Sequence, residues 1–398
     1  MTYLQQGTPD FRRANLALFA GGFVTFAILY STQPLLPIYS KEFHVSPTVA
    51  SFSLSVSTAT LAVFMLIAGS LSEALGRKRV MAVTLFISSI VALLTAFSPN
   101  FPALLGLRIL QGVFLAGLPA IAMAYLSEEV APQSIGMAMG LYISGNSVGG
   151  MAGRIFTGIF TDLFSWRVAI GFIGVLSILC SVLFVWLLPP SRHFEAQPLQ
   201  FTKLGASMWH HLQDTGLLRL YGIGFLLMGG FVSLYNYISY QLTEAPYYLS
   251  QTVVGFIFIV YLTGTFSSTW MGRLADRKGR KKILWTAISL MLSGALMTLS
   301  MPLALKLLGI AVFTFGFFGA HSIASGWVGR RASGEKAQAS SLYLFFYYAG
   351  SSIGGSAGGE LWTLWGWPGV VMMIASFLVI AVVLSLRIPL KQWQQKTA

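Results

Sequence analysis

The sequence predicts an all-α membrane protein of twelve transmembrane helices, arranged as two pseudo-symmetric six-helix bundles. The 398 residues are 55% hydrophobic and only 9% charged, too few charges to cover so much apolar surface in water. Twelve stretches of at least 19 residues contain no Asp, Glu, Lys or Arg. A basic loop also occurs twice, 203 residues apart, which indicates that one membrane unit has been duplicated.

Each charge-free stretch is long enough to cross the membrane once, because a hydrocarbon core of ~30 Å takes about 20 helical residues. In chain order the stretches are 14–40, 43–72, 80–107, 109–127, 130–153, 168–191, 220–243, 245–272, 283–305, 307–329, 337–359 and 361–386. We therefore expect an N-terminal bundle over 1–190, a cytoplasmic linker with one surface helix over 191–216, and a C-terminal bundle over 217–398.

The distribution of charge predicts the topology. A net charge of +13 can indicate a nucleic-acid protein, but if the N-terminus is cytoplasmic, all but five of the 25 Lys and Arg fall on the cytoplasmic side. The exceptions are Lys41, Arg108, Arg154, Arg167 and Lys306. This bias follows the positive-inside rule and predicts a multi-pass protein of the inner (cytoplasmic) membrane with both termini in the cytoplasm. We expect a monomer in the lipid bilayer with a small-molecule substrate and no nucleic-acid partner.

The duplicated loop joins the second span to the third and the eighth to the ninth. Its two copies share their glycines, their acid and their first arginine: Gly69, Glu73, Gly76 and Arg77, then Gly272, Asp276, Gly279 and Arg280. An acid at a helix end, followed by basic residues four to six positions on, can form a charge-assisted clamp between neighbouring helices. The same basic residues also serve as a topology signal.

A second repeat lies in the fifth and eleventh spans. Its first copy is Gly145, Ser147, Gly149, Gly150 and Gly153, and each residue recurs 205 positions later. Small residues let helices in lipid approach closely, so both spans are expected to be closely packed. A hinge role is compatible with this packing.

The loops GSLSEALGRKR at 69–79 and GRLADRKGRKK at 272–282 resemble the signature loops of the major facilitator superfamily. Leu107, Arg108, Gln111 and Gly112 resemble its fourth-helix arginine motif, and the glycines at 145, 149 and 150 resemble the fifth-helix motif of its drug:proton antiporter branch. The proline of that motif is replaced here by Asn146. The resemblance covers essentially the whole chain, and it implies loop clamps that hold in one conformation and break in another.

Two arginines are expected inside the membrane. Arg108 lies about six residues into its span, where a charge costs roughly 2.5–3.5 kcal/mol on insertion scales. The resemblance implies a part for it in proton coupling or substrate binding; a structural bond to helix-end carbonyls is the alternative. Arg154 lies in the outer third of the fifth span. Its nearest acid in sequence, Asp162, is about 80° round the helix and ~12 Å along it.

All twelve Asp and Glu lie in loops or near span ends, and none is expected at the membrane centre. A cavity that contains arginines and no acid favours neutral or anionic substrates over cations. The candidates for proton coupling are therefore Asp162, His321 and Arg108. His321 is the only histidine in a span, and it titrates in a useful range, although a neutral hydrogen-bonding role is the alternative.

Uncharged polar residues complete the expected cavity. With Arg108 and Arg154, they are Tyr30, Gln33, Asn146, Asn236, Tyr237, Tyr240, Tyr343 and Tyr347. The resemblance implies that their spans, the first, fifth, seventh and eleventh, border the central cavity. Tyr30 and Gln33 share a helix face, as do Asn236 and Tyr240. Such groups orient a ligand in an otherwise apolar site.

Together these features predict a secondary active transporter that moves a small organic solute by alternating access, with proton-coupled efflux of a drug or metabolite. The alternative is an importer or facilitator of a neutral or anionic metabolite such as a sugar or organic acid. A receptor or scaffold would not need both loops and Arg108. We expect no enzyme, no metal site and no cofactor, since no ATP-binding loop, metal-ligand cluster or nucleophile–base set occurs. The proton gradient is the expected energy source.

Overall fold

The structure, a computed structural model, describes residues 3–194, 196, 201–333 and 335–389. The first half contains α1 (Pro9–Tyr30), η1 (Gln33–Leu35), α2 (Leu36–Glu42), α3 (Pro47–Leu75), α4 (Arg77–Thr95), α5 (Phe101–Leu115), α6 (Pro119–Glu129), α7 (Ile135–Leu163) and α8 (Trp166–Leu187). After α9 (Phe201–Gln213), the second half contains α10 (Thr215–Thr243), α11 (Gln251–Ile257), η2 (Phe258–Val260), α12 (Tyr261–Lys278), α13 (Arg280–Met297), α14 (Leu303–Arg331) and α15 (Lys336–Leu386).

The predicted all-α fold of twelve transmembrane helices is confirmed. In the described part of the chain, nine helical segments are long and apolar enough to cross a membrane. The glycine-rich α7 and α13, which begins with three basic residues, add two crossings. The segment α15 contributes two, because its helix breaks at Gly366, where φ is 60°.

The outer surface of the bundle is apolar, as a lipid-facing surface must be. On α8 one face exposes Val175, Leu179, Val182 and Trp186 at helical spacing, and Trp186 is 80% exposed. The opposite face buries Phe184 among the other helices. Large apolar side chains that would be unfavourable in water are therefore compatible with lipid.

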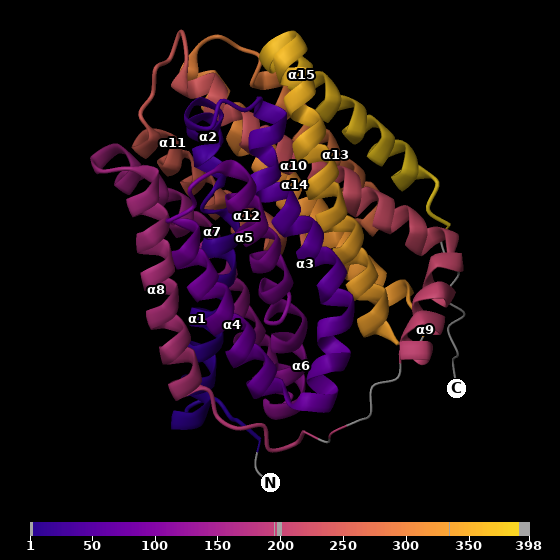
Figure 1. The fold of residues 1–398 in the computed structure, drawn as a ribbon. Coiled ribbons are helices and arrows are strands. Elements are labelled where there is room, and N and C mark those ends of the chain that lie inside the picture. The colour runs from indigo at the N-terminus through magenta and orange to yellow at the C-terminus, as the bar shows by residue number, and fades with distance from the viewer. Residues whose placement is uncertain (1–2, 195, 197–200, 334, 390–398) are drawn as a thin grey trace.

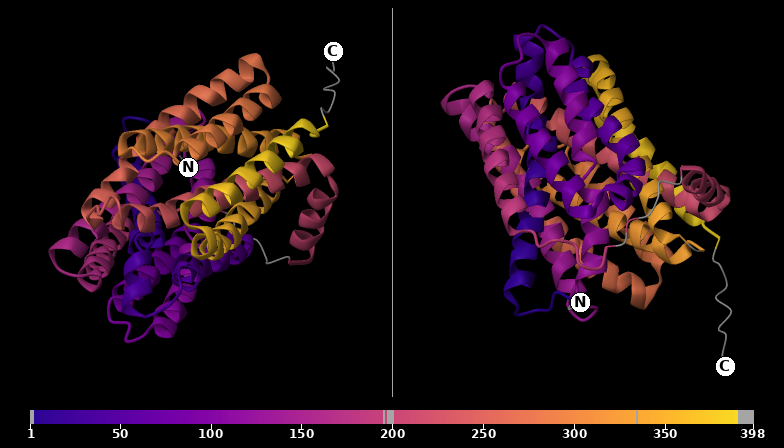
Figure 2. Two further views of the ribbon diagram at one scale, coloured as in Figure 1. Left: turned by 90° about the horizontal axis from the view of Figure 1, so that it is seen from above. Right: turned by 60° about the horizontal axis from the view of Figure 1, so that its bottom comes forward.

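The twelve spans form two bundles that lie against each other (Figure 1). The turns at Gly76 and Gly279 lie at one end of the molecule, here called the basic-loop end. The other end, at which α2 finishes, is called the opposite end. Leu4 pairs with the backbone at the end of α6, and the Pro389 carbonyl accepts from Arg331 at the end of α14. The helix α9 packs outside the bundles (Figures 1 and 2).

Glycines bring two pairs of helices into backbone contact, one pair in each half. A methyl group at Gly149 of α7 would lie 2.2 Å from the carbonyl oxygen of Phe23 on α1. The equivalent Gly354 of α15 would place its methyl 2.6 Å from Cα of Gly229 on α10. The repeated glycines therefore set the spacing of α1 against α7 and of α10 against α15, which makes each half a closely packed unit.

The two halves meet from the opposite end to the middle of the membrane. The helices in contact include α3 with α15 and α7 with α11. At the centre is a hydroxyl seam of Ser55, Thr58, Ser352 and Ser356, in which Thr58 Oγ1 and Ser352 Oγ are 2.8 Å apart. Among the described transmembrane residues, no hydrogen bond joins the halves between this seam and the basic-loop end.

The expected linker contains α9, and its residues 195 and 197–200 lie outside the described residues. The linker ends at Asp214, whose carboxylate accepts hydrogen bonds from the backbone N–H groups of Gly216 and Leu217 and so caps α10. Arg331, at the end of α14, also donates to it over 2.8 Å. Burial acts to raise the pKa of this carboxyl, but these hydrogen bonds outweigh burial and hold the pKa below its usual value.

Candidate functional site

Arg108 is bound almost entirely by backbone. Its guanidinium donates to the carbonyl oxygens of Ser53 (2.6 Å), Ile28 (3.1 Å) and Leu29 (2.7 Å), and to Oε1 of Gln111 (2.5 Å). The two α1 carbonyls belong to the last turn of a helix that ends at Tyr30, where carbonyls lack intrahelical partners and carry partial negative charge. In this structure Arg108 therefore joins α5, α3 and the end of α1.

Arg154 of α7 is also buried, with 1% of its surface exposed, but it has fewer hydrogen bonds. Nε donates to Oε1 of Gln33 over 2.8 Å, and Nη1 donates to the carbonyl of Gly150 over 2.7 Å. Its guanidinium carbon lies near three aromatic ring centres: Tyr30 at 4.3 Å, Phe258 at 4.4 Å and Tyr261 at 5.0 Å. Because Phe258 and Tyr261 belong to the second half, this cation lies at the contact between the bundles.

Gln33 connects Arg154 to the second half. Its amide nitrogen donates to Oδ1 of Asn236 on α10 over 2.8 Å, and Asn236 is fully buried. Nearer the opposite end, the hydroxyl of Tyr240 donates to the Leu36 carbonyl over 2.8 Å and lies 2.6 Å from Oγ of Ser40. The prediction that Tyr30 and Gln33 share a helix face is wrong, because α1 ends at Tyr30 and Gln33 lies in the separate turn η1. Gln33 meets Asn236 across the two halves, and Tyr240 meets η1–α2.

Asp162 does not pair with Arg154. Its carboxylate accepts hydrogen bonds from the backbone N–H groups of Gln251 (3.1 Å) and Thr252 (2.7 Å) and so binds the first turn of α11. Gly158 lies between Arg154 and Asp162 on α7. It packs against the Gln251 carbonyl so closely that a methyl group on Gly158 would be 2.3 Å from the carbonyl oxygen. The contact of α7 with α11 therefore closes the opposite end beside Arg154.

His321 belongs to an aromatic cluster within the second half. Its Nδ1 lies 3.0 Å from the hydroxyl of Tyr343, and its ring is 4.6 Å from the ring of Tyr347 and stacked on Phe317. It is in contact with neither arginine. The structure thus brings together three predicted residues on α14 and α15: His321, Tyr343 and Tyr347. They lie closer to the basic-loop end than Asn236 does.

The remaining predicted residues lie in helix contacts. The hydroxyl of Tyr237 donates to the Gly355 carbonyl over 2.7 Å, inside the second half. Asn146 faces α1, where its Oδ1 is buried without a hydrogen-bond partner beside Gly22. Both residues therefore take part in helix packing in this structure, away from the Arg154 group.

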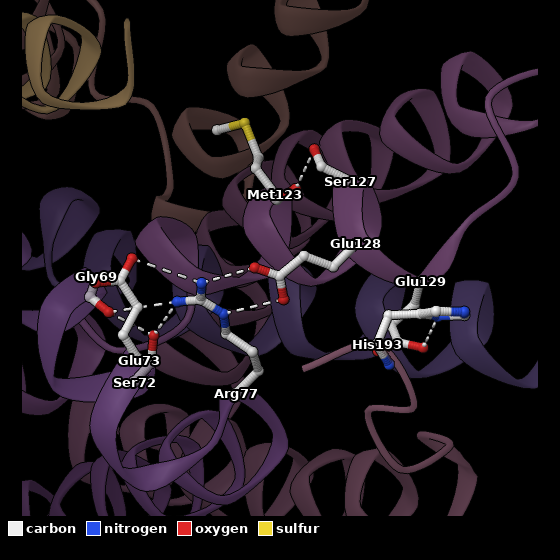
Figure 3. A network of polar contacts seen from close by, with 9 residues as sticks. All are labelled: Gly69, Ser72, Glu73, Arg77, Met123, Ser127, Glu128, Glu129 and His193. Atoms are coloured by element: carbon white, nitrogen blue, oxygen red, sulfur yellow. Dashed lines mark hydrogen bonds and ion pairs between the residues drawn. The ribbon is translucent and has the colours of Figure 1, made fainter. Parts of the chain in front are cut away.

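The first basic loop forms a clamp within its own half (Figure 3). Gly76 has φ of 97°, a conformation that glycine adopts readily, and it turns the chain so that Arg77 begins α4. Arg77 donates to both carboxylate oxygens of Glu128 at the end of α6, over 3.2 and 2.7 Å, while Glu73 is 3.6 Å away. The main acid partner is thus Glu128.

The second basic loop repeats the turn with a different clamp. Gly279 has φ of 94°, and Arg280 then donates back to Asp276 over 2.6 Å. Arg330 at the end of α14 lies 3.5 Å from the same carboxylate. Both Glu73 and Asp276 are about half exposed, and the ion pairs that each forms lie within its own half.

Sequence reasoning missed several residues of these groups: Ser40, Glu128, Phe258, Tyr261, Phe317 and Arg330. The adjacent acids Glu128 and Glu129, which end α6, were a visible signal, because a cluster of charge at a span end needs partners. Nothing in the local sequence marks Phe258 or Tyr261 as neighbours of Arg154, since the contact joins residues about a hundred positions apart.

Two bundles with buried polar residues where they meet, and lipid-compatible surfaces around them, define a polytopic membrane transporter. The chain belongs to the Major Facilitator Superfamily, whose family model matches residues 18–316 and 220–397. It is 55% identical over 385 residues to the uncharacterized MFS-type transporter YybF of Bacillus subtilis (strain 168), covering 97% of this chain and 95% of that protein. It is 47% identical over 386 residues to the inner membrane transport protein YnfM of Escherichia coli (strain K12), covering 97% and 93%.

Solved structures of the same fold have much lower sequence identity. The human organic anion transporter MFSD10 (TETRAN) matches with a TM-score of 0.73 and 18% identity, over 95% of this chain and all of that chain. A variant of the nucleoside transporter NupG matches with a TM-score of 0.75 and 17% identity, over 94% and 99%. The relatives are transporters, and these structures establish the fold.

Proposed function

We propose that the protein is a secondary active transporter of a small organic solute that works by alternating access and couples export to proton entry, as in the drug:proton antiporter branch. The observation that carries the proposal is the uneven contact between the halves. They are hydrogen-bonded from the opposite end to the hydroxyl seam, and within the described transmembrane residues no such bond lies nearer the basic-loop end. This is the arrangement expected of a cavity open to one side.

The basic-loop end is proposed to face the cytoplasm, with both termini, in the inner membrane. The loops carry Arg77, Lys78 and Arg79 in one half and Arg280, Lys281 and Lys282 in the other, and such clusters are retained on the cytoplasmic side. The described conformation is then open to the cytoplasm. Its clamps, which lie within the halves here, become contacts between the halves when that end closes.

The proton carrier is proposed to be His321 or Asp162, with Arg108 acting on either through the field of its charge. His321 of α14 is partly buried beside Tyr343, where protonation would place a charge among aromatic rings. Asp162 lies at the opposite end and binds the other half, so its protonation would weaken the contact between α7 and α11.

A second candidate function is import or facilitated passage of a neutral or anionic metabolite. Arg154 favours a neutral or anionic substrate, because a buried cation at the contact between the bundles repels organic cations. The direction of transport, and whether it is coupled to proton movement, decide between the two functions.

The test is transport by inverted membrane vesicles that hold an acid-inside pH gradient. Vesicles with the wild-type chain, vesicles with His321→Ala and vesicles without the protein are challenged with candidate solutes while the gradient is followed by a fluorescent dye. Proton-coupled export predicts that a solute collapses the gradient only when the wild-type chain is present. Solute uptake without any change in pH contradicts coupling and supports the facilitator.

A further inference from the structure

Arg154 carries a charge that the described part of the chain does not neutralise. It forms no ion pair with any described Asp or Glu, and the nearest acid in sequence, Asp162, is occupied by the backbone of α11. A cation in the membrane interior is unfavourable, and such residues usually pair with an opposite charge. The counter-charge is thus missing from the described residues.

Arg154 also has unused hydrogen-bonding capacity. Of the five N–H groups of a guanidinium, it uses one on Gln33 and one on Gly150, which leaves three. Arg108 is the internal comparison: it uses four on three carbonyls and Gln111, and only one remains. Arg108 is therefore close to saturated, whereas Arg154 has donors left for a ligand.

Other buried donors near Arg154 lack partners. The hydroxyl of Tyr261, whose ring lies 5.0 Å from the guanidinium, is buried without a hydrogen bond, and the residue is only 8% exposed. Thr157, one turn further along α7, is fully buried, and its hydroxyl likewise has no partner. Buried donors without acceptors are unfavourable, and a bound anion would accept from them.

The group now occupying the best position on Arg154 is a neutral amide. Gln33 accepts from Nε with its amide oxygen, and its amide nitrogen bonds to Asn236 of the other half. A carboxylate binds a guanidinium more strongly than an amide does, because both partners are charged and two parallel hydrogen bonds can form. An incoming carboxylate would therefore displace Gln33 and weaken its bridge to Asn236.

We propose that Arg154 binds the carboxylate of a small organic anion, in the place that the Gln33 amide takes in this structure, and that this exchange helps to open the opposite end. The rings of Tyr30, Phe258 and Tyr261 surround the guanidinium and suit an apolar or aromatic body on the anion. The inference rests on the proposed transport function, because it names the substrate class of that function and one step of the conformational change.

Binding to the purified full-length protein in detergent tests the first part. The probes are acetate, benzoate and indole-3-acetate, each measured beside its neutral amide by equilibrium binding. We expect at least one acid to bind better than its amide, and Arg154→Gln to weaken that binding by about ten- to hundredfold. Arg154→Lys should retain part of the affinity, because it keeps the charge without the bidentate geometry.

Two substitutions of Gln33 give opposite results that a purely structural role does not explain. Gln33→Ala removes the competitor and should tighten binding of the acid. Gln33→Glu supplies a carboxylate from within and should abolish it, and the melting temperature of each variant shows whether it has folded. If neither the wild type nor Gln33→Ala prefers any acid over its amide, or if Arg154→Gln keeps the preference, the proposal is wrong.

The second part is tested by spin labels on Phe164→Cys and Tyr248→Cys in a Cys180→Ser background. Both positions are exposed near the opposite end, one in each half. The acid that binds should lengthen the distance between the labels, and its amide should not; an unchanged distance contradicts the opening step. Vesicles separate this inference from the proposed function: binding through Arg154 without transport refutes only transport, whereas transport that is indifferent to Arg154→Gln refutes only the anion site.

Discussion

Arg108 and Arg154 show that two buried arginines can have different roles in one protein. Arg108 gives most of its N–H groups to carbonyls of α1 and α3, so removing it leaves several acceptors unsatisfied. Arg154 has one carbonyl and one side-chain amide, and it faces rings from the other half. The first arginine is suited to hold helices together, and the second to exchange partners.

Arg108→Gln is expected to destabilise the protein strongly. The carbonyls of Ser53 and Leu29 would lose a charged donor in a buried site, at a cost of about 1–3 kcal/mol for each group left unsatisfied. The melting temperature of the purified protein in detergent measures the effect. Arg167→Gln is the matched control, since Arg167 is 42% exposed in its ion pair with Glu42 and exposed pairs contribute little. Equal melting temperatures for both variants would contradict this role.

At the residue scale, the sequence identified both arginines and gave helix-end carbonyls as one alternative for Arg108, which the structure shows, but it did not identify which residues bind either arginine. A charge within an apolar stretch is visible from composition alone, because lipid makes it unfavourable. The carbonyls that bind Arg108 are 55 to 80 residues away in the chain, and their availability depends on α1 ending at Tyr30. Such long-range pairing is set by helix packing, which local patterns do not specify.

At the scale of single elements, the repeated glycines make a direct prediction about packing. Gly149→Ala would put a methyl group 2.2 Å from the Phe23 carbonyl, so α7 and α1 would have to separate. Gly140→Ala, on the same helix, meets nothing within 4 Å and serves as the control. We expect Gly149→Ala to lower the melting temperature clearly, and Gly140→Ala to leave it unchanged or raise it, because alanine favours helix more than glycine does. An unchanged melting temperature for Gly149→Ala would contradict this close packing of α7 against α1.

The Asp214–Arg331 pair predicts a dependence of stability on pH. Because the pKa of the Asp214 carboxyl is lowered in the folded protein, its contribution to stability is present above the unfolded pKa of ~3.9 and is lost as the pH falls through the folded value. Asp214→Asn should therefore lower stability at pH 7 by about 1–3 kcal/mol. Its difference from the wild type should shrink as the pH falls below about 4.

Thermal unfolding at pH 7 and at two pH values below about 4 checks this expectation. Asp10→Asn is the comparison, because the Asp10–Arg192 pair is more exposed on both sides and should contribute less. A difference between Asp214→Asn and the wild type that grows toward acid pH would contradict the sign of the shift.

The sequence predicted the number of spans well and their limits less well. Charge-free stretches end wherever a charge occurs, so the predicted fifth span stopped at residue 153, whereas α7 continues through Arg154 and Asp162 to Leu163. The predicted third stretch, 80–107, was too long. The third span ends with α4 at Thr95, and the fourth span begins with α5 at Phe101, before the charge at Arg108. Both errors occur at the buried arginines, where a charge is tolerated inside a helix because it has polar partners.

At the scale of the whole molecule, the contact between the halves predicts how motion can be blocked. Gly359 of α15 lies against the backbone of Thr48 at the start of α3, so these helices touch near the opposite end. Joining Thr48→Cys to Glu360→Cys with a short thiol-reactive reagent, in a Cys180→Ser background, should keep that end closed. We expect transport to stop in the linked protein, because alternating access requires that end to open, and each single cysteine variant to remain active after the same treatment. Full transport by the linked protein would contradict alternating access through this contact.

The hydroxyl seam of Ser55, Thr58, Ser352 and Ser356 has a consequence for the speed of such a motion. A hydroxyl both donates and accepts, and it turns about a single bond, so each member can find a new neighbour after a small slide of α15 along α3. Charged pairs or closely fitted large side chains would have to break before the helices could move. Hydroxyls instead exchange one set of bonds for another during the movement, so this contact adds little friction to the rotation of one half against the other.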